Sequence, residues 1–316
     1  MKDFQKLIKS LKKNLTKPDL LFIPLIFIIL LSVLAAFDIY EKGRHYFLST
    51  LPSPAKDYEI KKYPFIKNKY EPQISAHAAL IMDKDSGAIL YSRNQNFRFS
   101  PASTTKIMTS LIGLEYFKLS DILEVKTPIQ EGTLLGLFAG QKMTFENLLY
   151  AMMLPSANDA ASTMAQNYPG GFGNFIKKMN DKAQDLKLPN THFEDPAGLE
   201  DRHDYTTAWE LARLTSAALD NKIFAQVVST PSRLITDTLG NEYLVQNRNK
   251  LLGVDGVNGV KTGTTEEAGD VLVTSRNAKD HTIIIVVLRS EDRFADTHEL
   301  LNLVKEDNLT YLSIRP

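Results

Sequence analysis

The chain has 316 residues, of which 43% are hydrophobic and 23% are charged. These proportions are ordinary for a globular protein and exclude a chain that is disordered throughout. Lys and Arg number 37, and so do Asp and Glu, so a formal net charge of zero gives no reason to expect a nucleic-acid partner. With no cysteine, the sequence excludes disulfides, thiolate metal sites, iron–sulfur clusters and a cysteine nucleophile.

The N-terminal segment is basic and is followed by an apolar run. Residues 1–19 carry six lysines against two aspartates, a local net charge of +4, and residues 20–37 carry no charge. Eighteen helical residues span about 27 Å, close to the hydrocarbon core of a bilayer. We therefore predict a cytoplasmic tail at 1–19, a transmembrane anchor in the lipid bilayer at 20–37, and the remaining chain outside the cytoplasm.

Two other interpretations of the apolar run stay open. A signal peptide cleaved after Ala35 would make the protein secreted, although the run is longer than the usual signal-peptide core. A buried helix of a soluble protein does not account for the basic flank.

Residues 38–75 hold four prolines and show no sustained periodicity, so we expect a spacer between the anchor and the next domain. Alternatively, part of this segment packs against that domain, because it contains several apolar side chains. These are Tyr58, Ile60, Tyr63, Phe65 and Ile66.

Residues 76–308 alternate short apolar runs with helical patterns and predict one α/β domain, followed by a tail at 309–316. Strands are expected at 77–82 and 88–92 around a turn, and again at 270–275 and 282–288. Helices are expected at 103–117, from Thr144 to Pro155, and at about 294–305. An apolar stripe with helical spacing predicts another at 172–186, and a capping box at 207–210 predicts one that follows it. Strands at both ends with helices between them predict a mostly antiparallel sheet flanked by helices, with a helical subdomain.

The first candidate motif is SxxK at 103–106, a pattern that also occurs at Ser10 and Ser53. The motif works when a helix holds the serine and the lysine one turn apart on one face, within reach for proton transfer. Ser10 lies in the expected cytoplasmic tail, and Ser53 stands between two prolines, where a helical turn is disfavoured. Ser103 opens a predicted helix, whose N-terminus favours developing negative charge, so we single out Ser103 and Lys106.

The second motif is SxN at 156–158, which also matches at 92–94 and 275–277. The latter two fall at predicted strand ends, whereas Ser156 follows a proline between two predicted helices, where its polar groups can face a cleft. An alternative is that Ser156 or Asn158 only caps the following helix.

The third motif is KTG at 261–263, which occurs once. It lies in a glycine-flanked segment ahead of a core strand. Such a segment suits an edge strand whose backbone a ligand can approach closely.

Together, the three motifs have the order and approximate spacing found in serine DD-peptidases and serine β-lactamases. From about 76 to 290 the sequence resembles the low-molecular-weight penicillin-binding proteins, the serine-type D-alanyl-D-alanine carboxypeptidases of peptidase family S11. The further matching stretches are 102–109, 154–161, FEDPAGL at 193–199, HDYTTAWEL at 203–211 and KTGTTEEAG at 261–269. The resemblance implies a β-lactamase/DD-peptidase-like fold, peptidoglycan stem peptides ending in D-Ala-D-Ala as substrates, β-lactams as inhibitors, and no metal or cofactor.

The resemblance also implies roles for the catalytic residues. Ser103 would attack the terminal D-Ala-D-Ala bond, and Lys106 would be its base. A lysine can act as a base at neutral pH only if burial or a second cation, such as Lys261, lowers its pKa. Ser156 would pass a proton to the leaving amine, and Asn158 would orient Lys106 and bind the substrate amide.

The substrate carboxylate would contact Lys261, Thr262 and Thr264 around Gly263, and the backbone N–H groups of Ser103 and Thr264 would form the oxyanion hole. The position after KTG is Thr264, where many carboxypeptidases have His or Tyr, which leaves substrate preference open. Only about 25 residues follow the last predicted strand, too few for the second β-rich domain common in the family.

Other functions are weighed against this one. A β-lactamase with an acidic deacylation residue needs an E-x-x-L-N string between the second and third motifs. The similar but shorter string Glu-Leu-Leu-Asn at 299–302 falls after the third motif instead. An endopeptidase or transpeptidase would use the same residues, and a sensor would bind β-lactams or peptides without turnover. The six histidines form no H-x-H or H-E-x-x-H motif, which disfavours a metallopeptidase.

Overall fold

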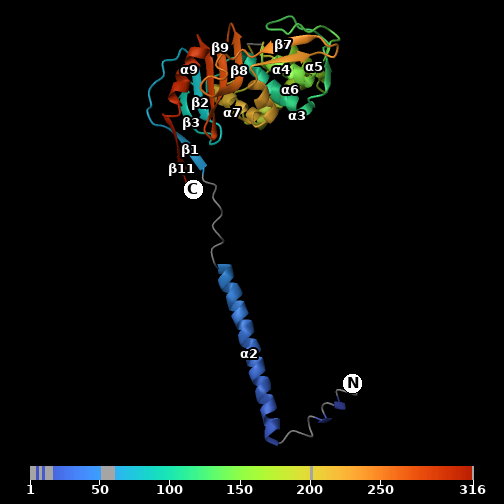
Figure 1. The fold of residues 1–316 in the computed structure, drawn as a ribbon, viewed down its shortest axis with the longest axis vertical. Helices are drawn as coiled ribbons and strands as arrows, with labels where there is room; N and C mark the ends of the chain where they lie inside the picture. The colour runs from blue at the N-terminus through green and yellow to red at the C-terminus, as the bar shows by residue number, and fades with distance from the viewer. Residues whose placement is uncertain (1–4, 7–8, 11–16, 51–60, 200–201, 315–316) are drawn as a thin grey trace. The chain divides into compact units, whose positions relative to one another are not determined.

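The computed structural model describes residues 5–6, 9–10, 17–50, 61–199 and 202–314 (Figure 1). The chain divides into two units, Met1–Glu59 with Arg315–Pro316, and Ile60–Ile314. In the first unit, the helix α2 runs over Lys17–Thr50 and includes the anchor expected at 20–37. Among the described residues, no helix proves both long and apolar enough to cross a membrane, so a transmembrane anchor is not confirmed. Most of the expected tail at 1–19 lies outside the described residues.

A five-stranded antiparallel sheet forms the centre of the second unit, in the order β3-β2-β10-β9-β8. Its strands are β2 Ala78–Asp83, β3 Ile89–Arg93, β8 Val257–Thr265, β9 Gly269–Ala278 and β10 His281–Ser290. Both the expected N-terminal hairpin and the expected C-terminal strand pair are therefore confirmed. The mostly antiparallel sheet is confirmed as well, and β8, which carries the KTG motif, is an edge strand as predicted.

Helices cover both faces of this sheet, which explains why β2 is buried along its whole length. Alternate residues of β2 enter two different apolar clusters, with Leu80 in one and Ile81 in the other. The helix α7 (Ala208–Leu219) contributes to the first cluster and α9 (Arg293–Leu303) to the second, and Figure 1 shows them on either side of the strands. A strand covered on both faces reads as a continuous apolar run rather than as an alternating one.

The helical subdomain lies between the sheet's outer strands in sequence. Its elements are the 3₁₀ turn η1 Ala102–Thr105 and the helices α3 Lys106–Tyr116, α4 Phe145–Met153, α5 Asn158–Asn167, α6 Gly171–Asp185 and α8 Lys222–Val228. Two small antiparallel pairs join them, β4 Ile122–Glu124 with β5 Lys142–Thr144 and β6 Ser232–Thr236 with β7 Glu242–Gln246. The first eight residues of α3 are buried, so this helix is the centre of the subdomain.

The expected helices form with local differences. Thr144 caps α4, because its Oγ1 accepts a hydrogen bond from the backbone N–H of Asn147. Thr207 likewise accepts from the N–H of Glu210, but the Glu210 carboxylate accepts from the N–H of Asn190 instead of returning to the cap. The predicted capping box is therefore only half formed. Along the apolar stripe of α6, Phe175, Met179 and Ala183 are buried, whereas Phe172 is 40% exposed. Ile176 and Leu186 are partly buried.

The compact unit extends beyond 76–308 at both ends. The strand β1 (Lys61–Ile66), from the expected spacer, pairs antiparallel with β11 (Leu309–Ile314), from the expected tail. Partner residues Ile66 and Leu309 are both buried, and this apolar contact explains why the spacer packs against the domain at this point. Pro64 is tolerated in β1 because a two-stranded pair leaves one edge of each strand unpaired.

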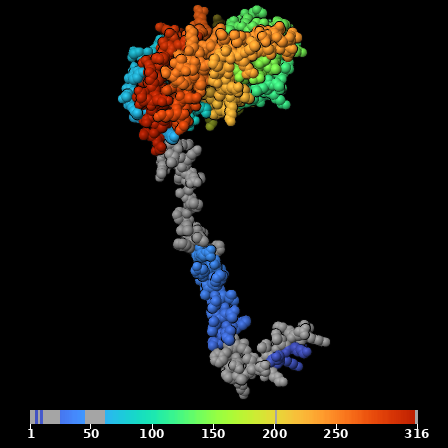
Figure 2. Space-filling model, in the orientation of Figure 1, coloured from blue at the N-terminus to red at the C-terminus, as the bar shows by residue number. Residues whose placement is uncertain are grey.

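The segment after β1 also lies against α9. The backbone N–H groups of Ser75 and Ala76 donate to the Asp296 carboxylate, each at 2.8 Å. Figure 2 shows this cyan segment directly beside the red C-terminal part of the chain.

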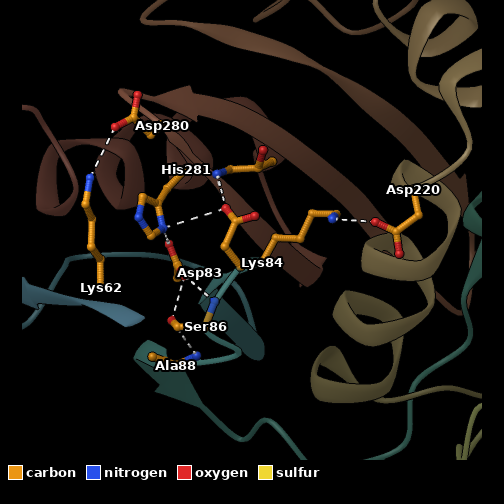
Figure 3. Close-up of polar contacts among 10 residues, drawn as sticks. Lys62, Asp83, Lys84, Ser86, Ala88, Asp220, Asp280 and His281 are labelled. Carbon is orange, nitrogen blue, oxygen red and sulfur yellow. Dashed lines mark hydrogen bonds and ion pairs between the residues drawn. The ribbon is translucent and has the colours of Figure 1, made fainter. Parts of the chain in front are cut away.

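A polar network joins the β2–β3 turn to β10 (Figure 3). The fully buried carboxylate of Asp83 accepts hydrogen bonds from the N–H and Oγ of Ser86 and lies 2.9 Å from Nδ1 of His281. The ring of His281 stacks on Tyr311 of β11, and the exposed pair Lys62–Asp280 links β1 to the same end of β10. Through these contacts the small β1–β11 pair is attached to the central sheet.

Candidate active site

Ser103 lies in the 3₁₀ turn η1, one residue after a backbone bend at Ala102, whose φ is +45°. Two glycines let neighbouring segments approach this turn. A Cβ on Gly198 would stand 1.9 Å from the carbonyl oxygen of Ala102, and a Cβ on Gly263 would stand 3.0 Å from the backbone nitrogen of Ser103. The glycines of the FEDPAGL and KTG stretches are therefore required by close backbone contact around the serine.

Lys106 begins α3 and is completely buried beneath Ser103. Its Nζ donates to Ser103 Oγ at 3.0 Å, to Asn158 Oδ1 at 2.7 Å and to the carbonyl oxygen of Ala197 at 2.7 Å. Burial lowers the pKa of this amine to about 7, with a further lowering by Arg248 and an opposing effect of Asp195. At neutral pH a substantial fraction of Lys106 is therefore uncharged and able to accept a proton from the serine.

Ser156 and Lys261 form a second serine–lysine pair. Lys261 Nζ donates to Ser156 Oγ at 2.9 Å and to the carbonyl oxygen of Thr262 at 2.9 Å. Both side chains are almost fully buried, and Ser156 has a φ of +73°, which is unusual for a residue other than glycine. Burial lowers the pKa of Lys261 well below its usual value, and the charge of Lys106 lowers it further.

Asn158 is the first residue of α5 and links Lys106 to the backbone of the segment before β5. Its Oδ1 accepts from Lys106, while its Nδ2 donates to the carbonyl oxygen of Glu131 and its N–H donates to that of Thr133. Neither Ser156 nor Asn158 caps α5 with its side chain, since the cap residue is Ala157 and no side chain bonds there. The capping alternative for this motif is therefore wrong.

A small cleft of about 70 Å³ opens over these groups and is bordered by five of the predicted site residues. These are Ser103, Ser156, Thr262, Gly263 and Thr264. The other three, Lys106, Asn158 and Lys261, lie beneath it and are bonded to the cleft residues or to one another. The three motifs, up to 158 residues apart in sequence, thus meet in one place.

Two arginines complete the cleft, and the sequence reasoning did not identify either. Arg293, next to the N-cap of α9, donates from Nη1 to the Gly263 carbonyl oxygen at 2.6 Å and contacts Thr264 Oγ1. Arg248 donates to Thr133 Oγ1 at 3.2 Å. No motif signals these positions, because their guanidinium groups reach the cleft only through the folding of α9 and of the segment after β7.

The cleft therefore combines a serine beside a buried lysine that is partly neutral at neutral pH with a positively charged wall. The first pair suits nucleophilic attack on a carbonyl, with the proton passing to the amine. Guanidinium groups beside threonine hydroxyls suit a carboxylate, which accepts several hydrogen bonds at once. This arrangement fits a peptide cleaved next to its C-terminus.

The other matches to the short motifs lie elsewhere. Ser92 is on β3, at the far edge of the sheet from β8, and Ser275 Oγ donates to Asn258 on the same sheet. Ser53 falls outside the described residues. Within the described residues, only the motif copies at 103–106, 156–158 and 261–263 thus border or underlie the cleft.

Comparisons with known proteins agree with this geometry. The family model for D-alanyl-D-alanine carboxypeptidases, peptidase family S11, matches residues 66–292. D-alanyl-D-alanine carboxypeptidase DacF of Bacillus subtilis is 34% identical over 222 residues, covering 67% of this chain and 57% of its own length. The D-alanyl-D-alanine carboxypeptidase of Streptomyces sp. strain K15 is 34% identical over 257 residues, covering 73% of this chain and 88% of its own.

Solved structures give the same result. The crystal structure of the Streptomyces K15 DD-transpeptidase superposes with a TM-score of 0.69 at 31% identity, over 74% of this chain and 98% of that one. Penicillin-binding protein D2 of Listeria monocytogenes, in its ampicillin-bound form, superposes with a TM-score of 0.67 at 26% identity, over 74% of this chain and 99% of that one. The chain belongs to the D-alanyl-D-alanine carboxypeptidase family, peptidase family S11.

Proposed function

We propose that this protein is a serine DD-carboxypeptidase that removes the terminal D-Ala from peptidoglycan stem pentapeptides through an acyl-enzyme on Ser103. The observation that carries the proposal is the buried amine of Lys106, 3.0 Å from Ser103 Oγ, with a pKa of about 7. Family membership supports the reaction class. The relatives' names, carboxypeptidase among them, support the substrate.

In the first half of the reaction, Ser103 Oγ attacks the carbonyl carbon of the D-Ala-D-Ala bond while its proton moves to neutral Lys106. The backbone N–H groups of Ser103 and Thr264 would bind the developing oxyanion, as the family resemblance implies. The C–N bond then breaks as Ser156, held by Lys261, passes a proton to the departing amine. The proton on Lys106 replaces the one that Ser156 has lost, so Lys106 is neutral again before the second half. D-Ala leaves, and an ester joins Ser103 to the shortened peptide.

In the second half, Lys106 takes a proton from a water molecule that attacks the ester. The C–O bond to Ser103 breaks, the proton returns to Oγ, and a peptide ending in a single D-Ala is released. Throughout, the substrate carboxylate is held by Arg293, Arg248 and the hydroxyls of Thr262 and Thr264. A β-lactam presents a similar carboxylate and carbonyl, so it would acylate the same serine and hydrolyse slowly.

The direct test is release of free D-Ala from a diacylated tripeptide ending in D-Ala-D-Ala. We expect release by the wild type and none by Ser103→Ala, with Ser53→Ala, in a chance match of the same motif, as the matched control. Intact mass after incubation with benzylpenicillin is expected to show one adduct on the wild type and on Ser53→Ala only. A wild type that is acylated by penicillin but never releases D-Ala would favour a sensor over an enzyme.

A transfer reaction is the second candidate, because one close relative is titled a DD-transpeptidase and another, from Pseudomonas aeruginosa, is named a D-alanyl-D-alanine endopeptidase at 31% identity. An amine replaces water in the second half, and the same residues serve. A peptide with a free N-terminal glycine, added to the assay as the amine acceptor, distinguishes hydrolysis from transfer. A transpeptidase forms a new amide with this acceptor, and the amount of hydrolysed product falls accordingly.

We further propose that residues 20–37 attach the protein to the cytoplasmic membrane, with the second unit on the outer side. Support comes from the uncharged apolar run and the +4 charge of the preceding tail. Protease added to intact spheroplasts is expected to digest the second unit. A second unit digested only after lysis would overturn this placement, and release into the medium would indicate cleavage instead.

A further inference from the structure

The strand pair β1–β11 has an outer face that carries large apolar side chains. Cross-strand partners in an antiparallel pair point to the same side, and so do residues two apart along one strand. On the inner face, Ile66 and Leu309 are buried against the second unit. The outer face holds Tyr63, Phe65 and Leu312, which are 37%, 45% and 55% exposed. Two aromatic rings and a leucine thus lie together on the surface.

The segment that carries this outer face is basic. Residues 61–70 contain four lysines and no acidic residue, a local charge of +4. The stretch 305–308 before β11 contributes −1 and β11 has no charge, so these ranges together carry +3, or +2 when Asp280, the partner of Lys62, is included. Tyr70 adds another aromatic side chain, 45% exposed. Exposed aromatic rings among lysines are typical of segments that contact the headgroup region of an anionic membrane.

The other exposed apolar strand pair, β6–β7, lacks this combination. Leu234 and Leu244 are cross-strand partners and are 55% and 65% exposed. The two strands contain one arginine and one glutamate, so they have no net charge, and their exposed apolar pair is aliphatic. This pair therefore provides a matched surface on which no membrane contact is expected.

The outer face of β1–β11 is near the proposed anchor in sequence and away from the cleft in the fold. Ten residues, 51–60, separate the end of α2 from β1. Tyr311 of β11 stacks on His281, the first residue of β10, whereas Arg293 of the cleft follows the last residue, Ser290. A strand of ten residues is about 30 Å long, so the face and the cleft lie towards opposite ends of β10. Figure 1 shows β1 and β11 at the end of this unit away from α4 and α5.

We propose that the outer face of β1–β11, formed by Tyr63, Phe65 and Leu312 with the lysines of the same segment, binds the headgroup region of an anionic lipid membrane. The inference rests on the proposed attachment through residues 20–37 and adds a second contact that holds the catalytic unit at the membrane surface. Because a short tether gives the face a high effective concentration near the lipid, weak binding is sufficient. The cleft, at the other end of β10, stays open to substrate.

The test places one fluorophore on this face of the full chain. Since the sequence has no cysteine, Thr310→Cys, directly opposite Phe65, can be labelled at a single position with a nitrobenzoxadiazole maleimide. The labelled chain is reconstituted in vesicles of phosphatidylcholine and phosphatidylglycerol, with and without nitroxide-labelled lipid. We expect the nitroxide lipid to quench this label by about half. A label at Leu244→Cys, the matched control on β7, should be quenched by less than about a tenth.

Two further measurements separate the apolar and the charged parts of the face. Tyr63→Ser combined with Phe65→Ser, in the Thr310→Cys chain, should reduce quenching about threefold. Replacing phosphatidylglycerol with phosphatidylcholine should reduce it about twofold, because the lysines lose their anionic partners. Both aromatic side chains are exposed, so the double variant should fold normally, and an unchanged rate of benzylpenicillin acylation verifies this.

Flotation of the vesicles distinguishes failure of this inference from failure of the proposed anchor. If the chain floats with the vesicles but its Thr310→Cys label is not quenched, the anchor holds and the membrane-binding face is wrong. If the chain does not float, the anchor is wrong, and absence of quenching by added vesicles then overturns the face as well. Equal quenching at Leu244→Cys, or quenching that persists in the double variant, would also contradict the assignment. Cross-linking of two Thr310→Cys chains by a short bismaleimide would assign the face to a second copy of this chain instead.

Discussion

Lys106 Nζ lies 3.0 Å from Ser103 Oγ and also bonds to the carbonyl oxygen of Ala197 and to Asn158 Oδ1. A protonated amine has three N–H groups and would use all three in these contacts. The neutral amine keeps two N–H groups for Asn158 and Ala197 and turns its lone pair toward the serine hydroxyl. The same three partners therefore serve both protonation states, and loss of one proton converts the resting site into the reactive one.

The pH dependence of acylation follows from this geometry. Because burial lowers the pKa of Lys106 to about 7, the neutral fraction falls tenfold per pH unit below that value. The logarithm of the rate constant for acylation by benzylpenicillin, plotted against pH, should therefore rise with a slope of one from pH 5.5 to about 7. Above about pH 7 the rate constant should level off. Stopped-flow measurement over pH 5.5–8.5 checks this, with circular dichroism at each pH to verify folding. A flat profile would exclude Lys106 as the base.

The same shift has a consequence for stability. The folded-state pKa of Lys106 lies below that of the unfolded chain, so between about 7 and 10 the unfolded state binds more protons than the folded state. The contribution of Lys106 to the free energy of unfolding should therefore rise with pH in this window, by at most about 1.4 kcal/mol per pH unit, and stay constant below it. Lys106→Met removes the group, so the stability of the wild type relative to this variant, measured by denaturant midpoints, should increase as pH rises from 7 to 9.5.

The control for that experiment is Lys118→Met, at an exposed lysine just after α3. The denaturant midpoint of this variant should differ from that of the wild type by the same amount at every pH in the window. If the gap between Lys106→Met and the wild type were also constant from pH 7 to 9.5, the lowered pKa of Lys106 would be wrong.

The sequence predicted the parts of the fold that local patterns determine. Thr144 caps a helix, and the runs at 270–275 and 282–288 form neighbouring strands, because capping and apolar periodicity are set within a few residues. The edge position of the KTG strand was also predicted, from the glycines that flank it.

The parts that depend on contacts between distant segments were less predictable. β1 pairs with β11 across more than 240 residues, and neither segment has a strong pattern of its own. Arg248 and Arg293 resemble any other surface arginine in the sequence, since only the folded chain brings their guanidinium groups beside Thr262 and Gly263. Ordered motifs located the nucleophile and the lysines, whereas the positively charged wall required the tertiary structure.

Gly198 is predicted to be essential for the position of the nucleophile. Its φ is +74°, and a Cβ there would overlap the carbonyl oxygen of Ala102, directly before Ser103. Gly198→Ala should lower the free energy of unfolding by about 3 kcal/mol and slow penicillin acylation of the folded protein. Gly240→Ala, in the β6–β7 turn, shares a positive φ but meets nothing within 4 Å, so it should cost only about 1 kcal/mol and leave acylation unchanged. Equal effects of the two variants would contradict the steric argument.

Arg293 is predicted to recognise the C-terminal carboxylate. It contacts the KTG strand at Gly263 and Thr264, and its Nε is buried without a hydrogen-bond partner among the described residues. Arg293→Gln should lower kcat/KM about 30-fold for a peptide ending in D-Ala-D-Ala, yet change little for the same peptide with a C-terminal amide. Arg233→Gln, whose guanidinium pairs with Glu146 away from the cleft, should leave both rates unchanged. Equal losses for acid and amide would show that Arg293 has only a structural role.

The buried carboxylate of Asp83 is predicted to stabilise the attachment of the β2–β3 turn to β10 (Figure 3). Asp83→Ala leaves the N–H and hydroxyl of Ser86 and the ring nitrogen of His281 without their acceptor, which should cost about 3 kcal/mol in the free energy of unfolding. The exposed pair Lys62–Asp280 at the same end of the sheet provides the contrast, because Asp280→Ala should change stability by no more than about 0.5 kcal/mol. Urea denaturation of the two variants measures both quantities. Since β2 and β10 are separated from the KTG strand by β9, penicillin acylation per folded molecule should be the same in both variants, and a slower rate in Asp83→Ala would mean that the network also supports the active site.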